Sequence, residues 1–148
     1  MRWLAACLFA LWSASALGNT INVQIYDSVG ASYSTATIGA ELGAAYAIDF
    51  EPVMVLILGP SLEDERVAEQ RRIVRELDPD ETGVLYAIGT AGGGNYRGYS
   101  LTTNTAAELL PDAEGFRVLV LDGSGEIRLD SDSVLGADDL VAETPPEG

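Results

Sequence analysis

The sequence predicts a single α/β domain built on a mixed sheet, and three segments carry this prediction. Residues 53–58 are apolar without a break, which is typical of a strand buried on both faces. Residues 61–77 place apolar side chains at helical spacing and acidic side chains in the first turn, as helices favour. Residues 116–129 contain two strand-like runs around a turn at residues 122–125, which indicates a β-hairpin.

The segment before the first buried strand has weaker signals. Residues 21–25 alternate apolar and polar side chains and predict a strand. Residues 26–37 are rich in serine, glycine and threonine and favour neither helix nor strand. Residues 38–48 have helical spacing, but Gly39 and Gly43 each weaken a helix by about 1 kcal/mol relative to alanine. We expect a strand followed by a weak helix.

The helix predicted for residues 61–77 has signals at both ends. Ser61 is expected to be its N-cap, because a serine hydroxyl can accept a hydrogen bond from the first free N–H groups. Asp78 and Pro79 are expected to end it, because the residue before a proline avoids the helical conformation. Its exposed side is expected to carry ion pairs at helical spacing, made by Arg72 with Glu69 and Glu76.

The remaining elements complete the order. They are a strand at 84–88, a glycine-rich loop at 89–98, a short helix opened by a capping box of Thr105 and Glu108 and stopped by Pro111, the hairpin, and a last helix at 138–142. This order is typical of a thioredoxin-like sandwich, in which helices flank a central mixed sheet that ends in a C-terminal β-hairpin. The first strands are expected to pair in parallel through right-handed crossovers.

The N-terminus predicts export. Residues 1–18 combine one positive charge, an apolar stretch and a run of small residues, which is typical of a cleaved signal peptide. Cleavage is expected after Gly18, so that Asn19 opens the mature chain, with cleavage after Ala16 as the alternative. The apolar stretch is shorter than the roughly 20 residues that span a bilayer, so we expect no stable membrane anchor. Lipidation at Cys7 is disfavoured, because this cysteine lies in the middle of the stretch. The expected location is the periplasm or the medium.

The composition excludes several chemistries. All eight basic residues are arginines, histidine is absent, and Cys7 is the only cysteine. A mature chain of residues 19–148 therefore has no thiol, imidazole or lysine amine, which removes the commonest nucleophiles and bases. We expect no cofactor and no metal. The net charge of −15 repels nucleic acid and anionic lipid, so we expect neither as a partner.

These signals divide the chain into four parts. The expected parts are the signal peptide at 1–18, an N-terminal extension at 19–50 that packs on the domain, the thioredoxin-like domain at 51–142, and a disordered tail at 143–148.

Two stretches of the chain resemble the DUF4174 family. One covers residues 55–72, with the sequence Val-Leu-Ile-Leu-Gly-Pro-Ser at its start, and the other is the hairpin at 116–129. The resemblance spans roughly residues 51–142 and implies a thioredoxin-like domain of uncharacterised function in exported bacterial proteins. The family brings no agreed catalytic residues to this chain.

Several motifs fall short of a site. The position where a thioredoxin-like fold holds its thiol is the start of the helix after Gly59, and residues 60–63 contain no cysteine. Residues 89–94 match the glycines of a phosphate loop but lack its lysine. Residues 78–83 match the start of a calcium loop, but Gly89 stands where its last ligand should be a glutamate.

The loop after the second buried strand is the best candidate for binding. Tyr96, Arg97 and Tyr99 bring one cation and two aromatic rings into one irregular segment, which suits a carboxylate or a flat ligand. The sequence therefore predicts an exported, non-redox module that binds an unknown partner protein or small molecule. One alternative is a structural or stress-related envelope protein without a ligand. The other is a hydrolase that uses Glu63 and Asp64 as paired carboxylates. The oligomeric state stays open.

Overall fold

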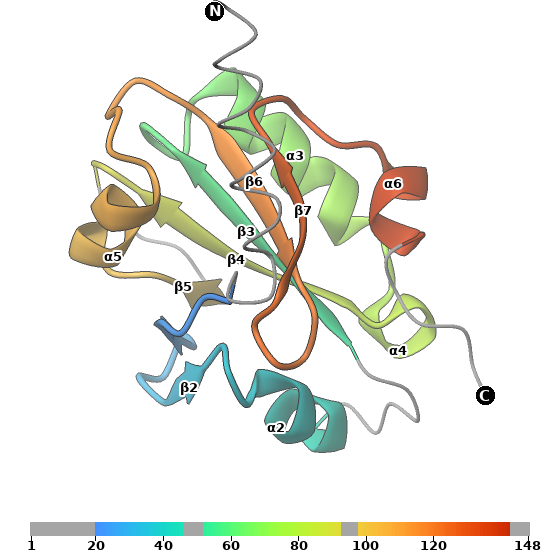
Figure 1. Ribbon diagram of the computed structural model, residues 1–148. Helices are drawn as coiled ribbons and strands as arrows, with labels where there is room; N and C mark the ends of the chain where they lie inside the picture. Colours follow the sequence, from blue (N-terminus) through green and yellow to red (C-terminus); the bar gives the residue numbers. More distant parts are fainter. Residues whose placement is uncertain (1–19, 46–51, 93–97, 143–148) are drawn as a thin grey trace, which may run out of the picture.

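The computed structural model describes residues 20–45, 52–92 and 98–142 (Figure 1). The predicted cleavage site at Gly18 and Asn19 and the predicted tail at 143–148 lie outside these residues. The described residues form one seven-stranded sheet with the order β2-β1-β5-β4-β3-β6-β7. No helix among the described residues is long and apolar enough to cross a membrane.

The elements have the following bounds. The strands are β1 (Gln24–Tyr26), β2 (Ser32–Ser34), β3 (Val53–Gly59), β4 (Val84–Thr90), β5 (Tyr99–Ser100), β6 (Arg117–Leu121) and β7 (Ile127–Ser131). The helices are α2 (Ile38–Ala45), α3 (Glu65–Arg75), α4 (Pro79–Thr82), α5 (Thr103–Leu109) and α6 (Ala137–Val141).

The centre of the sheet confirms the prediction from the apolar run. All seven residues of β3 are buried, and the strand pairs in parallel with β4 and antiparallel with β6. β6 and β7 form the predicted antiparallel hairpin, with a register shift between Val120 and Leu121. The central strand is therefore covered on both faces and along both edges, as its composition requires.

The expectation that the first strand joins the sheet in parallel is wrong. β1 pairs antiparallel with β2 and with β5. A tight turn explains the reversal, because the Asp27 carboxylate accepts hydrogen bonds from the N–H groups of Val29 and Ala31. Gly30 in the same turn has a φ of +93°, which glycine adopts without strain. The serine-rich segment therefore encodes a hairpin rather than a loop.

Two apolar cores lie on the two faces of the sheet. One face packs Leu56 of β3 and Leu119 of β6 against Ala106 of α5 and Ile38 of α2. The other face packs its strand residues against α3 and α6, which contribute Val67, Val74 and Leu140. Figure 1 shows α3 and α6 together, away from α5 and α2.

The end of the sheet at the β6–β7 turn is closed by main-chain contacts. We call this contact, between residues 20–39 and the turn at residues 122–126, the hairpin junction. The N–H of Ile21 donates to the carbonyl of Gly125 at 2.8 Å, and the N–H of Gly39 donates to the carbonyl of Gly123 at 2.9 Å. The fully buried Thr35 hydroxyl donates to the carbonyl of Ile21 and accepts from the N–H of Val23. Residues near the N-terminus thus pack against a turn about a hundred positions later.

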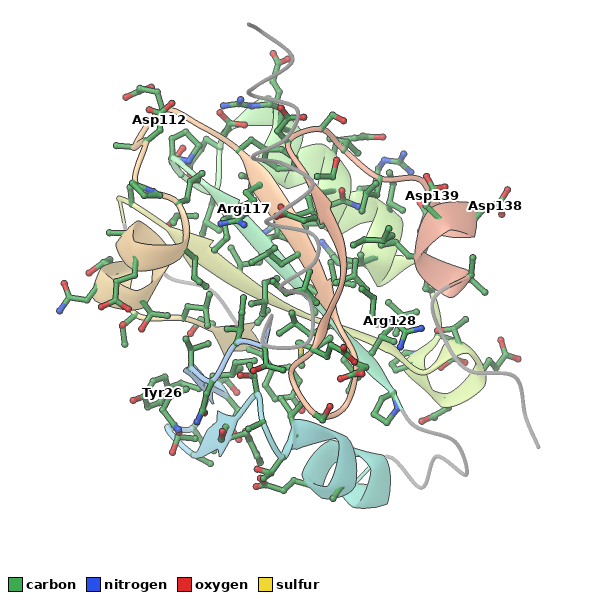
Figure 2. All side chains as sticks on the ribbon, viewed as in Figure 1. Tyr26, Asp112, Arg117, Arg128, Asp138 and Asp139 are labelled. Atoms are coloured by element: carbon green, nitrogen blue, oxygen red, sulfur yellow. The ribbon has the colours of Figure 1, made fainter. Side chains whose placement is uncertain are left out.

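An arginine ties α5 to the hairpin strands. Arg117 of β6, which is labelled in Figure 2, forms two hydrogen bonds with the Asp130 carboxylate of β7, at 2.9 and 2.7 Å. Its third donor reaches the carbonyl of Leu109, the last residue of α5, at 2.6 Å. The hydrogen bond with Asp130 raises the pKa of Arg117. A fixed cation at this helix end also satisfies a free carbonyl group.

Two predicted helix caps are wrong. Asp64, not Ser61, caps α3, because its carboxylate accepts from the N–H of Arg66 at 2.9 Å while Ser61 lies in a preceding turn. Thr102, not Thr105, caps α5, because the hydroxyl of Thr102 accepts from the N–H of Thr105 at 3.1 Å. The cap of α3 lies three residues later than predicted and that of α5 three residues earlier, in each case directly before the first helical residue.

The predicted end of the long helix is also displaced. α3 ends at Arg75 rather than near Leu77, and Asp78 and Pro79 begin the short helix α4 instead of a loop. Asp78 caps α4 by accepting a hydrogen bond from the N–H of Asp80. Pro79 occupies the first turn, where the missing N–H of proline costs no hydrogen bond within the helix.

A buried glutamine joins α3 to the loop before α6. Gln70 is fully buried, and its side-chain amide exchanges two hydrogen bonds with the main chain of Leu135, at 3.0 and 2.7 Å. Both polar ends of the side chain are thereby satisfied. The loop at Leu135 is held against the helix, and this fixes where α6 begins.

Candidate functional site

The best-placed surface for a ligand is the edge where the parallel strands β3 and β4 end. After β3 the chain enters α3 on one face of the sheet, and after β4 it continues to β5 and α5, whose Ala106 packs on the other face. In open α/β sheets whose strand connections diverge in this way, ligands bind at the carboxyl ends of the strands. We call residues 59–66, 90–92 and 112–116 the carboxyl edge. The two loops singled out from the sequence, at 60–63 and 89–98, both begin there.

Main-chain hydrogen bonds hold the two loops side by side. The N–H of Ala91 donates to the carbonyl of Gly59 at 3.1 Å, and that of Gly92 donates to the carbonyl of Pro60 at 3.0 Å. Gly59 has no room for a side chain, because a Cβ there would collide with the side chain of Val67. The first residues of both loops are therefore fixed by the sheet beneath them.

Arg66 joins the start of α3 to the loop before β6 at the carboxyl edge. Arg66 donates twice to the Asp64 carboxylate, at 3.0 Å each, and once to the carbonyl of Glu114 at 3.0 Å. Its guanidinium carbon lies 5.5 Å from the centre of the Phe116 ring, within the range of a cation–π contact. The loop before β6, which also holds Asp112 (Figure 2), is thereby fastened to the start of α3.

The negative charge of Asp64 serves to hold the Arg66 side chain. The hydrogen bonds from the Arg66 side chain lower the pKa of Asp64. Burial raises it, but the N–H groups of Arg66 and Val67 lower it further, so the pKa stays below its ordinary value. A general acid needs a carboxyl group whose pKa is raised. Asp64 therefore does not fit the acid role in the hydrolase alternative, and its neighbour Glu63 is exposed.

The position of the thiol in a thioredoxin-like fold is occupied by residues that do no thiol chemistry. Pro60, Ser61 and Leu62 lead from β3 towards α3, and all three are half-buried. A serine nucleophile needs an adjacent base, and the whole sequence contains no histidine. The arrangement can offer hydrogen-bond donors, acceptors and a partly exposed arginine to a ligand.

Of the predicted binding residues, the structure describes Tyr99. It lies in β5, where it pairs with Ala87 of β4, and its ring meets that of Tyr33 edge to face with centroids 6.1 Å apart. Both tyrosines pack against the core on the α5 face. Tyr96 and Arg97 lie outside the described residues, so the predicted binding role of this loop stays a prediction.

The remaining motifs have structural roles in the described part of the chain. Asp78 of the calcium-like segment caps α4, and Gly83 ends that helix with a φ of +73°. Among the described residues, no group of three acidic or other metal-binding side chains is placed to hold a metal ion.

The contacts of Arg66 with Glu114 and Phe116 were not predicted from the sequence. Residues 64 and 66 are close in the chain, but Glu114 and Phe116 lie about fifty positions away. The only local signal is an arginine two residues after a possible cap, which also occurs on ordinary exposed helices. The contact arises because β6 lies next to β3, and the sequence shows no sign of that neighbourhood beyond the order of the elements.

Comparison with known proteins defines the fold. The chain has a thioredoxin-like α/β fold, with helices on both sides of a mixed central sheet. It is similar to the crystal structure of Peroxidoxin BcpB from Mycobacterium tuberculosis, with a TM-score of 0.53 and 12% identity over 84% of this chain and 92% of that one. It is also similar to a putative electron transport protein from Aquifex aeolicus VF5, with a TM-score of 0.52 and 11% identity over 84% and 94% of the two chains.

The sequence comparisons return nothing further. No protein-family model and no curated protein sequence matches this chain. At identities of 11 and 12%, the two structures show a shared fold and not a shared activity. The resemblance to DUF4174 therefore stays a prediction.

Proposed function

We propose that this chain is an exported, non-redox thioredoxin-like module, related to the DUF4174 family, that binds a partner protein or small ligand at its carboxyl edge. The observation that carries the proposal is the pairing of this fold with a sequence that has no cysteine after Cys7. The edge that would hold a redox centre is intact, and its side chains are suited to recognition alone. The similarity of residues 55–72 and 116–129 to DUF4174 supports the proposed family.

The proposed ligand surface extends from the described edge into the loop that follows β4. Arg97 and Tyr96 belong to this loop, which leaves the edge after Gly92 and leads to Gly98, directly before β5. An arginine flanked by aromatic rings favours a carboxylate-bearing or planar ligand. The exported state rests on the predicted signal peptide, with the mature chain beginning at Asn19 in the periplasm or the medium.

The redox half of the proposal is tested with insulin. In a turbidity assay with dithiothreitol, residues 19–148 are expected not to accelerate the reduction of insulin disulfides. The turbidity should rise at the rate of the blank, which contains dithiothreitol without the protein. A thiol oxidoreductase serves as the positive control. Turnover above the blank in protein free of contaminating oxidoreductase would refute the non-redox assignment.

The binding half is tested by thermal unfolding in the presence of a panel of carboxylates and planar aromatic compounds. A ligand that binds only the folded chain raises the unfolding free energy by RT ln(1 + [L]/Kd). At least one compound is expected to raise the midpoint, and Arg97→Ala is expected to reduce that shift. Without ligand, Arg97→Ala should change stability by less than about 0.5 kcal/mol, as exposed substitutions do. A larger loss would mean that Arg97 is structural, and a panel without effect would favour the structural alternative.

A further inference from the structure

The residues of α3 have a net charge opposite in sign to that of the protein as a whole. The chain has a net charge of −15, yet α3 contains four of its eight arginines and only two glutamates, which gives the helix a charge of 4 − 2 = +2. An isolated patch of positive charge on an acidic surface attracts anions to that place.

Two of the four arginines are already used inside the fold. Arg66 is engaged by Asp64 and the carbonyl of Glu114. Arg72 forms ion pairs with Glu69 at 2.7 Å and with Glu76 at 3.0 Å, as predicted from the spacing, and its pKa is raised, chiefly by the hydrogen bond to Glu69. These pairs hold the Arg72 side chain against the helix surface.

The other two arginines have no such role. Within the described part of the chain, neither Arg71 nor Arg75 has an acidic group within 4.0 Å or a hydrogen-bonded partner for its side chain. A helix C-terminus favours cations, which accounts in part for Arg75 in the last turn. Arg71 lies before the last turn, where this effect is weaker, so the helix itself does not explain it.

The two unpaired arginines lie on one side of the helix, and one of them, Arg75, borders an opening. Arg71 and Arg75 are four residues apart and therefore neighbours on the helix surface. Arg72, Arg75 and Glu76 line an open cleft of about 320 Å³, a volume at the small end of the range for small-molecule sites. A ligand there would meet the guanidinium of Arg75, whose planar fork matches the oxygens of phosphate and carboxylate groups, beside the ion pair of Arg72 with Glu76.

We propose that Arg71 and Arg75 form a binding site for a small oxyanion that bears phosphate or carboxylate groups, next to the fixed Arg72. A large polyanion fits this surface less well. The parts of it that lie more than one Debye length, roughly 8 Å, from the arginines would face the acidic remainder of the chain and be repelled by it. The site lies on the outer side of α3 and not at the carboxyl edge. Either proposal can therefore fail without the other.

The experiment is calorimetric titration of residues 19–148 with sodium phosphate and, separately, with sodium citrate at constant ionic strength. Saturable binding of at least one anion is expected. Arg71→Gln and Arg75→Gln should each weaken it about tenfold, the size of one lost charge-assisted hydrogen bond. Arg128→Gln is the matched control, because it removes the same charge from an arginine of β7 that lies near Asp122, and it should bind like the wild type. Saturation by phosphate alone or by citrate alone supports the site and identifies which anionic group it prefers.

Two results would overturn the proposal. One is the absence of saturation with both anions. The other is an equal loss of affinity in Arg128→Gln, which would show that only the net charge matters. Unfolding midpoints measured without anion serve to confirm that all three variants fold.

Discussion

The two ends of the sheet are built by different means. At the hairpin junction, main-chain groups meet directly, and a Cβ on Gly125 would lie 2.5 Å from the carbonyl oxygen of Ile21. At the carboxyl edge, main-chain hydrogen bonds join the loops after β3 and β4, but the loop before β6 is fastened by the Arg66 side chain, which is 43% exposed. The hairpin junction is therefore closed by main-chain groups in close contact, whereas the carboxyl edge depends in part on a side chain that is open to solvent.

This difference separates the part of the molecule that holds the fold from the part that can serve a ligand. Close main-chain contact is costly to open, because it leaves buried N–H and carbonyl groups without partners. Exposed side-chain contacts are individually weak and can be rearranged when a ligand arrives. We therefore expect substitutions at the hairpin junction to affect stability, and those at the carboxyl edge to affect local order and recognition.

The largest effect is expected at Gly125. Gly125→Ala adds a Cβ against Ile21 at a φ of +90° and should lower the unfolding free energy by about 3 kcal/mol, from backbone strain and overpacking together. Gly30→Ala is the matched control, because Gly30 has a φ of +93° with nothing within 4 Å of the added Cβ, and it should lose only about 1 kcal/mol. Urea denaturation measures both. Equal losses in the two variants would contradict the tight contact at the hairpin junction.

A smaller loss is expected from a residue that belongs to neither end. Gln70→Leu keeps the volume but leaves the N–H and carbonyl of Leu135 without their partner, which should destabilise the fold by about 2 kcal/mol. The exposed Arg75→Gln on the same helix should change stability by less than about 0.5 kcal/mol. Wild-type stability of Gln70→Leu would mean that the loop at Leu135 is held by other contacts.

The carboxyl edge should respond locally. Arg66→Ala removes the contacts with Asp64, Glu114 and Phe116 and should lower stability by only about 1 kcal/mol, since the side chain is partly exposed. Hydrogen exchange should become faster at residues 112–116 and stay unchanged at residues 122–126. Faster exchange at both ends would show that the two regions are not independent.

The smallest predicted effect is a difference in acid stability. The pKa of Asp64 is lowered by Arg66, and that of Asp122 is also lowered, because hydrogen bonds from Ser124 and Glu126 and the charge of Arg128 outweigh the effect of burial. Each carboxylate therefore stabilises the fold fully above its ordinary pKa of 3.8, and this stabilisation is lost as the pH falls through the lower pKa of the folded state.

Unfolding midpoints between about pH 6 and pH 2 test this. Asp64→Asn and Asp122→Asn should each be less sensitive to acid than the wild type. A wild-type slope in both variants would show that other carboxylates control the acid transition.

Much of the fold follows from patterns within short stretches of sequence. The apolar run at β3, the helical spacing of α3 and the two runs of the β6–β7 hairpin each predict their element because burial imposes a period on the side chains. The hairpin of β1 and β2 has such a period only at its start, where residues 21–25 alternate apolar and polar side chains. Its position depends on main-chain contacts with a distant turn, and these leave a trace in the sequence only as glycines such as Gly39 and Gly125.

The site was less predictable than the fold. The order of the elements places the loops after β3 and β4 at one edge, so their neighbourhood follows from the fold class. The contacts of Arg66 depend on the loop before β6 lying next to the start of α3. No local pattern in the sequence indicates that these two segments are neighbours. Gln70 was missed for a related reason, because a polar residue on a buried helix face gives no hint of its partner.

The most direct test of the account is where a ligand protects the chain. The compound from the carboxylate and aromatic panel that raises the unfolding midpoint most is added at saturation to residues 19–148, and hydrogen exchange is followed by mass spectrometry. We expect slower exchange at residues 60–66 and 89–98, and no change at residues 122–126 of the hairpin junction. Protection confined to the hairpin junction, or a panel in which no compound slows exchange at the carboxyl edge, would contradict it.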